Sequence, residues 1–315
     1  MLHENLAPGT IELYERQYRE KLAPAAMMIR PIKEISSADI QTMLNGLAKG
    51  RLDGKEIDVS QSALKNLYKY LKRLFKYLSN EGYCQDIMIS ITLPRLEVES
   101  DSKRIKEIEV FTEEEIRKII ETPNRKQFLF QLALATGLRA SELLALTYDD
   151  FKDGNVSISK QINTHYKIDE SSYREYERVI QKPKSPSSVR AIPLPLNVQE
   201  AFKKYTIWHR QEMLRNGYRT DYVFTSESGR FLDKGNLRIA WIRHLKRAGV
   251  EYRKFHACRS TFCTMLCKNG VPLETASKLM GHSDVNITAK FYRLVSSSEM
   301  KKAADKIDSL FSIEN

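Results

Sequence analysis

The chain has 315 residues, of which 42% are hydrophobic. This length allows two domains that each bury a core, and the composition is that of a globular chain rather than a disordered one. The longest apolar stretch, Phe128 to Leu138, is well short of the roughly 20 residues that cross a bilayer, and the first ten residues lack the apolar core of a signal peptide. Four unevenly spaced cysteines argue against a disulfide framework. We therefore expect a cytoplasmic protein without a membrane partner.

The formal net charge of +11 is more informative than the rest of the composition. Such an excess attracts polyanions, and nucleic acid is the commonest large one. A basic, well-solvated surface with no such partner has the same charge. Net charge alone therefore favours DNA or RNA as the partner but leaves the simpler interpretation open.

The pattern of apolar residues over 1–96 predicts a small helical domain. Its strongest pattern runs from Ser62 to Gly82, where one helical face is apolar and another is basic. The apolar seam comprises Leu64, Leu67, Leu71, Leu74 and Leu78. The basic face comprises Lys65, Lys69, Lys72 and Lys76, and Arg73 lies between the two stripes with Tyr70 and Tyr77. Such a face can follow a phosphate backbone, although an ordinary helix with solvated lysines has the same pattern.

Residues 97–111 predict a charged linker, and residues 112–294 predict a second domain. Thr112 and Glu115 have the spacing of a capping box at the start of its first helix. Further helices are expected at 127–135, at 139–146 and over most of the chain from 197 onward, and β-prone stretches lie at 156–162, 179–181, 189–194 and 222–225. The fold class expected is mainly α with a small antiparallel β-sheet in the second domain.

A cluster of one histidine and three cysteines, His256, Cys258, Cys263 and Cys267, first suggests a zinc site. On a single helix, however, His256 and Cys267 would lie roughly 16 Å apart along the axis, too far to share one ion. Cys258 would also point about 140° away from Cys263. The sequence therefore predicts no metal site here, and Cys263 and Cys267 are better interpreted as core residues.

The polar residues at the start of that helix are His256 and Arg259, three positions apart and hence neighbours on one face. A histidine and an arginine at a helix N-terminus can bind an anion, because the helix dipole and free amides add to their charge. A surface pair without a ligand is the alternative interpretation.

Four motifs occur in order along the last two-thirds of the chain: TGLRASELLAL, KPKSPSSVRAIPL, FHACRSTF and LMGHSDVNITAKFY. Together they resemble the tyrosine recombinases, most closely the integrases of phages and conjugative transposons. The resemblance implies an N-terminal core-site-binding domain and an α+β catalytic domain that form a clamp around DNA.

The resemblance also implies a role for particular residues. Arg139 and Arg259 match the arginine pair, His256 and His282 the two histidines, and Tyr292 the nucleophile. Lys184 matches the lysine of a β-hairpin, with Lys182 as an alternative, and Glu142 matches an acidic residue that supports the site.

These residue types suit strand transfer on a DNA phosphate. Guanidinium groups stabilise the charge that develops on non-bridging oxygens, and imidazoles can accept or share the proton of the attacking phenol. A lysine can donate a proton to the leaving 5′-oxygen as general acid. Because the arginines supply positive charge and a phosphotyrosyl bond conserves the phosphodiester energy, no metal or nucleotide cofactor is expected.

The family's reaction resembles that of type IB topoisomerases and passes through a 3′-phosphotyrosyl intermediate and a Holliday junction. It implies double-stranded DNA with specific core sites, a homotetramer on two sites, and accessory excision or DNA-bending proteins. The location implied is the DNA of a bacterial cytoplasm, and the biological outcome is integration or excision of a phage, transposon or other mobile element. The tail at 295–315 has an apolar helical stripe that either docks on a neighbouring protomer or folds back.

Two departures from the family pattern occur. The helix start reads His-Ala-Cys-Arg-Ser, so that Ala257 and Ser260 replace the Asp and His that are more usual, which puts the fine geometry in question. The sequence also begins near the core-binding domain without an arm-binding module, and a natural short form or a truncated chain fits equally.

A second class of function also fits part of the sequence. Leu273 to Tyr292 has the pattern of a helix-turn-helix, as in a DNA-binding regulator without catalysis. That interpretation explains the charge but gives no role to Arg139, Lys184 or the pair His256 and Arg259.

Overall fold

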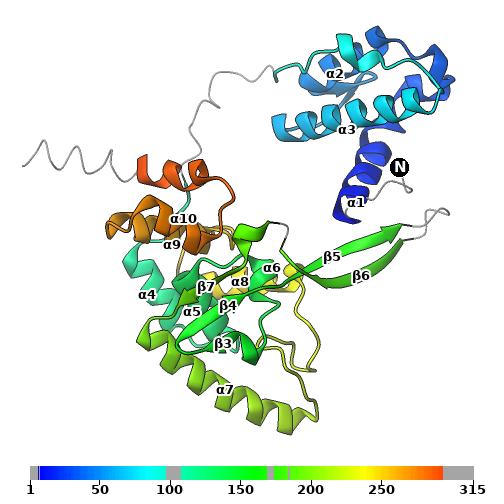
Figure 1. Cartoon of the computed structure of the whole chain (residues 1–315). Helices are drawn as coiled ribbons and strands as arrows, with labels where there is room; N and C mark the ends of the chain where they lie inside the picture. The colour runs from blue at the N-terminus through cyan, green and yellow to red at the C-terminus, as the bar shows by residue number, and fades with distance from the viewer. Residues whose placement is uncertain (1–5, 7, 97–107, 169–173, 184, 294–315) are drawn as a thin grey trace, which may run out of the picture. The chain divides into compact units, whose positions relative to one another are not determined.

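The computed structural model describes residue 6 and residues 8–96, 108–168, 174–183 and 185–293 (Figure 1). The chain divides into two compact units: residues 1–106 with 165–177, and residues 107–164 with 178–315. Lys184 and the predicted tail at 295–315 lie outside the described residues. Among the helices that the structure describes, none is long and apolar enough to cross a membrane.

The N-terminal part of the first unit, as far as residue 96, is mainly helical with one short hairpin. Helix α1 (Pro8–Gln17) continues into a π-helical turn (Tyr18–Leu22), and α2 (Ser37–Ala48) leads through strands β1 (Arg51–Leu52) and β2 (Lys55–Glu56) to α3 (Gln61–Asn80). Ser36 and Asp39 form a capping box that fixes the start of α2, because each side chain accepts from the other residue's backbone N–H. The core lies between α2 and α3, where Leu44, Leu47 and Leu64 are fully buried.

Helix α3 largely follows its predicted pattern. Leu64, Leu67 and Leu71 are buried, whereas Leu74 and Leu78 are only half-buried. Tyr70 lies inside the core against Tyr14 rather than between the two faces, so it is unavailable to a ligand. The four lysines of the basic face, Lys65, Lys69, Lys72 and Lys76, are exposed.

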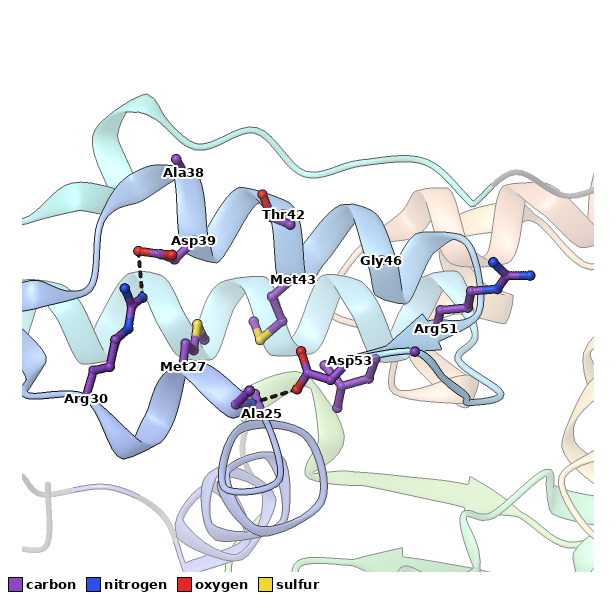
Figure 2. Close-up of a pocket in the computed structure, with 13 residues that line it drawn as sticks. Ala25, Met27, Arg30, Ala38, Asp39, Thr42, Met43, Gly46, Arg51 and Asp53 are labelled. Atoms are coloured by element: carbon purple, nitrogen blue, oxygen red, sulfur yellow. Dashed lines mark hydrogen bonds and ion pairs between the residues drawn. The ribbon is translucent and has the colours of Figure 1, made fainter.

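A hollow lies beside α2 on the same unit (Figure 2). Five residues of α2 line it: Ala38, Asp39, Thr42, Met43 and Gly46. Arg30 closes one end through an ion pair with Asp39 at 2.8 Å. Arg51 lies at the other end, on strand β1.

The second unit contains the remaining helices and a three-stranded antiparallel sheet in the order β3, β4, β7 (Figure 1). Strands β5 and β6 pair with each other, and residues 165–177 of these strands and their connection group with the first unit. Helix α5 packs against α4, α7 and α9, and α10 packs against α9 and β7. The elements are α4 (Glu113–Glu121), α5 (Gln127–Thr136), α6 (Ala140–Leu143), β3 (Phe151–Lys152), β4 (Asn155–Ile158), β5 (Gln161–Ile168), β6 (Arg174–Gln181), β7 (Arg190–Pro193), α7 (Leu196–Asn216), α8 (Lys234–Ala248), α9 (Ala257–Lys268) and α10 (Leu273–Met280).

These elements confirm the fold class predicted from the sequence: a mainly α chain with small antiparallel sheets. The capping box of Thr112 and Glu115 starts α4 as expected. One prediction was wrong: residues 222–225 form no continuous strand, and only Tyr222 and Thr225 pair, each through an isolated bridge. β-Prone residues make a strand only where a partner strand runs beside them.

The buried core of this unit positions two segments of the candidate site, the turn after α5 and the helix α9. Trp241 and Phe130 are fully buried and pack against each other. Helix α5 ends at Gly137, whose φ of +60° is left-handed, and a Cβ there would lie 2.6 Å from the Phe262 side chain. Glycine at 137 therefore lets α9 approach the turn that carries Arg139.

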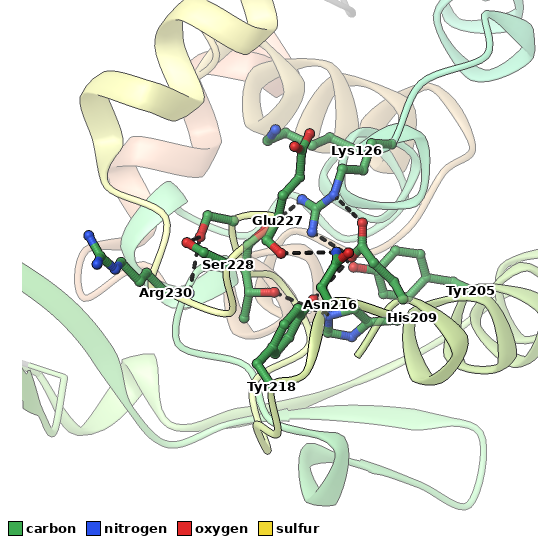
Figure 3. A network of polar contacts seen from close by, with 12 residues as sticks. Lys126, Tyr205, His209, Asn216, Tyr218, Glu227, Ser228 and Arg230 are labelled. Carbon is green, nitrogen blue, oxygen red and sulfur yellow. Dashed lines mark hydrogen bonds and ion pairs between the residues drawn. The ribbon is translucent and has the colours of Figure 1, made fainter. Parts of the chain in front are cut away.

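A polar network on α7 lies within the same unit (Figure 3). His209 is fully buried and bonds to Tyr148 at 2.5 Å and Thr225 at 3.1 Å. Next to it, Arg125 binds both carboxylate oxygens of Glu212 at 2.6–2.7 Å. Burial lowers the pKa of His209. The side chains of His209, Arg125 and Glu212 each have a protein partner, as a stable buried network requires.

Candidate active site

The carboxylate of Glu142 organises the candidate site. This side chain is 1% exposed and lies in α6, one turn after Arg139. Its oxygens accept from Arg139 Nη1 at 2.7 Å, from the Arg139 backbone N–H at 3.0 Å and from Arg190 Nη2 at 2.9 Å. Burial alone would raise the pKa of Glu142, but its bonds with Arg190 and Arg139 outweigh burial and lower it. Glu142 is therefore an anion that holds two arginines.

The C-terminal end of α10 faces the same arginines. The last carbonyls of a helix have no partner within it and carry the negative end of its dipole. Here Arg190 Nε donates to the Leu279 carbonyl at 2.7 Å, Arg139 Nη2 donates to Gly281 at 3.1 Å, and Arg259 donates to Met280. Three cations thus bind three consecutive carbonyls, directly before His282.

Arg259 is the most enclosed of these arginines, at 3% exposure in the first turn of α9. Its Nη1 also donates to the Gly137 carbonyl at 2.8 Å. Burial and the charge of Arg139 lower the pKa of Arg259 to about 9. It therefore remains a cation at neutral pH. Its guanidinium joins the turn after α5 to the end of α10.

Both candidate histidines are neutral at pH 7. His282 is half-buried, and its Nδ1 lies 2.8 Å from the hydroxyl of the fully buried Thr288. Burial, Arg259 and Arg139 lower the pKa of His282 to about 4. His256 is exposed, and partial desolvation with the charges of Arg259 and Arg139 lowers its pKa as well. A neutral imidazole can accept a proton.

One detail of the expected anion site was wrong. The first amides of α9 are not free, because the N–H groups of Ala257 and Cys258 donate to the carbonyls of Lys254 and Phe255, and those of Arg259 and Ser260 donate to His256. Anion binding here depends on side chains rather than on helix amides. Ser260 itself is buried in this turn.

The hydroxyl of Tyr292 is engaged with the backbone. It donates to the Val271 carbonyl, and the ring packs with Cys263, Cys267 and Met280. Burial and the neighbouring Cys267 raise the pKa of Tyr292 to about 12. The hydrogen bond that the structure gives to the Tyr292 hydroxyl is therefore to a carbonyl and not to a histidine, and its phenol is harder to ionise than a free tyrosine.

Cys263 and Cys267 lie in the core, as the sequence predicted, and Cys258 is buried as well. Cys258 packs in the main core of the unit, and Cys263 and Cys267 form a smaller buried cluster with Met280. Burial raises the pKa of Cys258 and raises that of Cys263 to about 12. These thiols are packing residues and remain protonated.

The remaining predicted residues are separate from this cluster. Lys184 lies outside the described residues, while its alternative Lys182 is described and exposed, just after β6. The residues of the predicted basic face, Lys65, Lys69, Lys72, Lys76 and Arg73, belong to the first unit.

Sequence reasoning missed Arg190. It stands in the motif KPKSPSSVRAIPL and was interpreted only as part of a strand. Its side chain is 6% exposed and contacts Glu142 and α10. The available signal was an arginine in a predicted strand with no acidic residue close to it in the sequence. If such an arginine is buried, its charge needs a partner from a distant part of the chain.

Comparisons with known proteins identify the family of this chain. The model of the phage integrase family matches residues 109–299. A tyrosine recombinase described as XerC-like, from Caldanaerobacter subterraneus subsp. tengcongensis, is 37% identical over 96% of this chain and 78% of its own length. A tyrosine recombinase XerD from Listeria monocytogenes is 24% identical over 96% of this chain and 93% of its own length. The chain belongs to the phage integrase family and is a tyrosine-type site-specific recombinase.

Solved structures show the same fold. An integrase of transposon Tn1549, in complex with transposon right end DNA, matches with a TM-score of 0.69 at 22% identity, and the match covers 96% of both chains. A lambda integrase dimer bound to a core site matches with a TM-score of 0.61 at 17% identity, over 92% of this chain and 90% of that one.

The pKa of His282 predicts how stability depends on pH. The unfolded chain binds a proton at His282 below pH 6.5, whereas the folded chain does so only below about pH 4. Acidification through this window therefore favours unfolding. With allowance for partial exposure, the loss is about 2–3 kcal/mol. In urea titrations between pH 7 and pH 4, the unfolding free energy of His282→Gln should fall by about 2–3 kcal/mol less than that of the wild type.

His256→Gln is the matched comparison. Because His256 is exposed, its replacement should change the pH dependence of the unfolding free energy less than His282→Gln does. An unfolding free energy of His282→Gln that falls with acid as steeply as that of the wild type would contradict the assignment of a neutral His282.

Proposed function

We propose that the chain cleaves one DNA strand by attack of Tyr292 on a phosphodiester, forming a 3′-phosphotyrosyl bond and releasing a 5′-hydroxyl. The attack of a second 5′-hydroxyl on that bond rejoins the strands. The observation that carries the proposal is the group of arginines fixed by Glu142 and the α10 carbonyls, next to two neutral histidines. A phosphate is the ligand that such fixed guanidiniums suit.

Arg139 and Arg259 are the proposed phosphate ligands. Each guanidinium has five N–H donors, and the contacts above use two Nη groups of each side chain for protein acceptors. Remaining donors can bind the non-bridging oxygens of a phosphate. Because the arginines are already oriented, little reorganisation is needed when charge develops in the transition state.

The proton transfers follow from the same geometry. Tyr292 must leave Val271 before it attacks, and its proton then needs an acceptor. His282 and His256 are neutral and can accept or share that proton. Lys184 is the proposed general acid for the leaving 5′-oxygen, with Lys182 as the alternative.

The proposed partner is double-stranded DNA with a specific core site. The net charge of +11 and the exposed lysines of α3 support this partner. We further infer that the two units form a clamp around DNA and that four protomers act on two sites through a Holliday junction. Among similar structures, one is a transposon integrase in complex with transposon DNA, which supports a mobile element as the source of the site.

The alternative of a non-catalytic regulator is not favoured. In the described residues, the Gly281 carbonyl in the turn after α10 binds Arg139, and Tyr292 on the next helix is half-buried. A recognition helix would not require the buried assembly of Glu142, Arg190 and Arg259.

The nucleophile is tested with a duplex that carries the natural site, identified by sequencing DNA attached covalently to the wild-type protein after incubation with genomic DNA of its source. A nick beside the cleaved bond lets the short fragment diffuse away and traps the product. The wild type should form a complex that survives denaturant. Tyr292→Phe should bind this duplex but form none, because it has no hydroxyl.

Tyr252→Phe is the control, since Tyr252 is an exposed tyrosine of the same unit outside the site. It should form the complex like the wild type. Covalent product in Tyr292→Phe, or its loss in Tyr252→Phe, would contradict Tyr292 as the nucleophile.

The general acid is tested with a duplex whose 5′-bridging oxygen is replaced by sulfur. Lys184→Ala should slow cleavage of the normal duplex by about 10²- to 10⁴-fold, as expected for loss of a general acid. A thiolate leaves without protonation, because thiol pKa values lie near 8.5. The sulfur duplex should therefore restore the Lys184→Ala rate but not that of Arg139→Ala.

Lys182→Ala is the matched variant, two positions away in the same motif. If Lys182→Ala rather than Lys184→Ala shows the rescue, the acid is Lys182. If neither variant is rescued, the leaving oxygen takes its proton from another group.

A further inference from the structure

We propose that Arg190 is a positioning residue of the reaction, which sets Arg139 and His282 against the same phosphate by joining Glu142 to the end of α10. This inference rests on the proposed function and adds a residue to it. Arg190 lies at the start of β7, and the segments it joins are far apart in sequence.

The guanidinium of Arg190 has a partner on each side. Nη2 donates to Glu142 Oε2 at 2.9 Å, and Nε donates to the Leu279 carbonyl at 2.7 Å. Nη1 donates to the Ser188 carbonyl at 2.9 Å and lies 3.4 Å from Glu142 Oε1. One rigid planar group therefore fixes a carboxylate, a helix end and the segment before β7.

One partner of Arg190 contacts a proposed catalytic residue, and another lies close to one in the sequence. The Glu142 carboxylate that Arg190 binds also binds Arg139 at 2.7 Å. The Leu279 carbonyl lies three residues before His282, and only Met280 and the left-handed Gly281 intervene. A shift of Arg190 would thus move Arg139 through Glu142 and His282 through α10.

The close packing at Gly281 indicates that this position of Arg190 is specific. A Cβ on Gly281 would lie 2.8 Å from Arg190 Nη1 and 3.1 Å from its Cζ. The backbone of the turn therefore lies against the guanidinium plane itself. Lysine at 190 would keep one charge but could not bind Glu142, Ser188 and Leu279 in three directions.

The chain contains a matched control for stability. Arg125 also binds both oxygens of a buried glutamate, Glu212, and donates to a backbone carbonyl, that of Thr225, at 2.6 Å. Its side chain is 17% exposed, compared with 6% for Arg190. Arg125 belongs to the network around His209. In the described residues it contacts Glu212, Thr225 and Trp208, and none of these is a proposed catalytic residue. Replacing Arg190 removes a positively charged partner from the buried carboxylate of Glu142, and replacing Arg125 removes one from that of Glu212.

The test compares Arg190→Met, Arg190→Lys and Arg125→Met with the wild type. The probe is the nicked duplex carrying the mapped site, at saturating concentration. Three quantities are measured: the single-turnover rate of covalent attachment, the Kd for the duplex and the thermal midpoint of unfolding. Arg190→Met should react about 10- to 100-fold more slowly, as for other residues that orient a catalytic ligand, with little change in Kd.

Arg125→Met should lower the thermal midpoint but react at the wild-type rate, because its loss affects stability alone. Arg190→Lys should stay slow, since charge without the planar fork does not hold three partners. If Arg190→Met fails to fold, Arg190→Lys alone tests the positioning role of Arg190. A wild-type rate in Arg190→Lys or in folded Arg190→Met overturns the inference and leaves the proposed function standing.

Equal slowing of Arg125→Met also overturns the inference, because rate would then follow stability rather than position. If the wild type itself forms no covalent complex linked through Tyr292, the proposed function fails first and this inference fails with it. The two failures are distinguished by the wild-type reaction alone.

Discussion

The ionic contact between Glu142 and its two arginines is the interaction on which the site depends. A buried carboxylate is costly unless its charge is matched, and Arg139 and Arg190 match it here. The same arginines, with Arg259, bind the three carbonyls at the end of α10. Four segments of the chain, the turn after α5, β7, α9 and α10, are thereby joined by one group of charges. The excess of cations over anions in that group is what leaves the site ready for a phosphate.

The histidine and the tyrosine differ in what sets their pKa values. Burial, with the charges of Arg259 and Arg139, lowers the pKa of His282 to about 4, so its imidazole is neutral at physiological pH. Burial and the neighbouring Cys267 raise the pKa of Tyr292, whose hydroxyl is bonded to Val271. The guanidiniums of Arg139 and Arg259 are thus fixed by protein partners within the site, whereas the hydroxyl of Tyr292 is bonded to the Val271 carbonyl. In the proposed reaction, cleavage begins with movement of the helical residues at 285–293 that carry Tyr292.

Local signals in the sequence predicted much of the fold, and distant contacts account for most of what it missed. The capping box of Thr112 and Glu115 and the leucines of α3 depend on neighbours within a few positions. Arg190 was missed because its partners Glu142 and Leu279 lie 48 and 89 positions away. Tyr292 is the nucleophile that the order of motifs predicts, whereas its bond to Val271 depends on how α10 and the following helix pack. No periodic pattern encodes such a contact.

A crystal structure of the wild-type chain covalently attached to its nicked site would test the central claim most directly, because it would show both the charged framework and the nucleophile. The account predicts that the phosphate is bonded to Tyr292 Oη and bound by Arg139 and Arg259. It also predicts that Glu142, Arg190 and the carbonyls of Leu279, Met280 and Gly281 keep the contacts described above. A phosphate bonded to another residue, or a site assembled only after those contacts break, would contradict it.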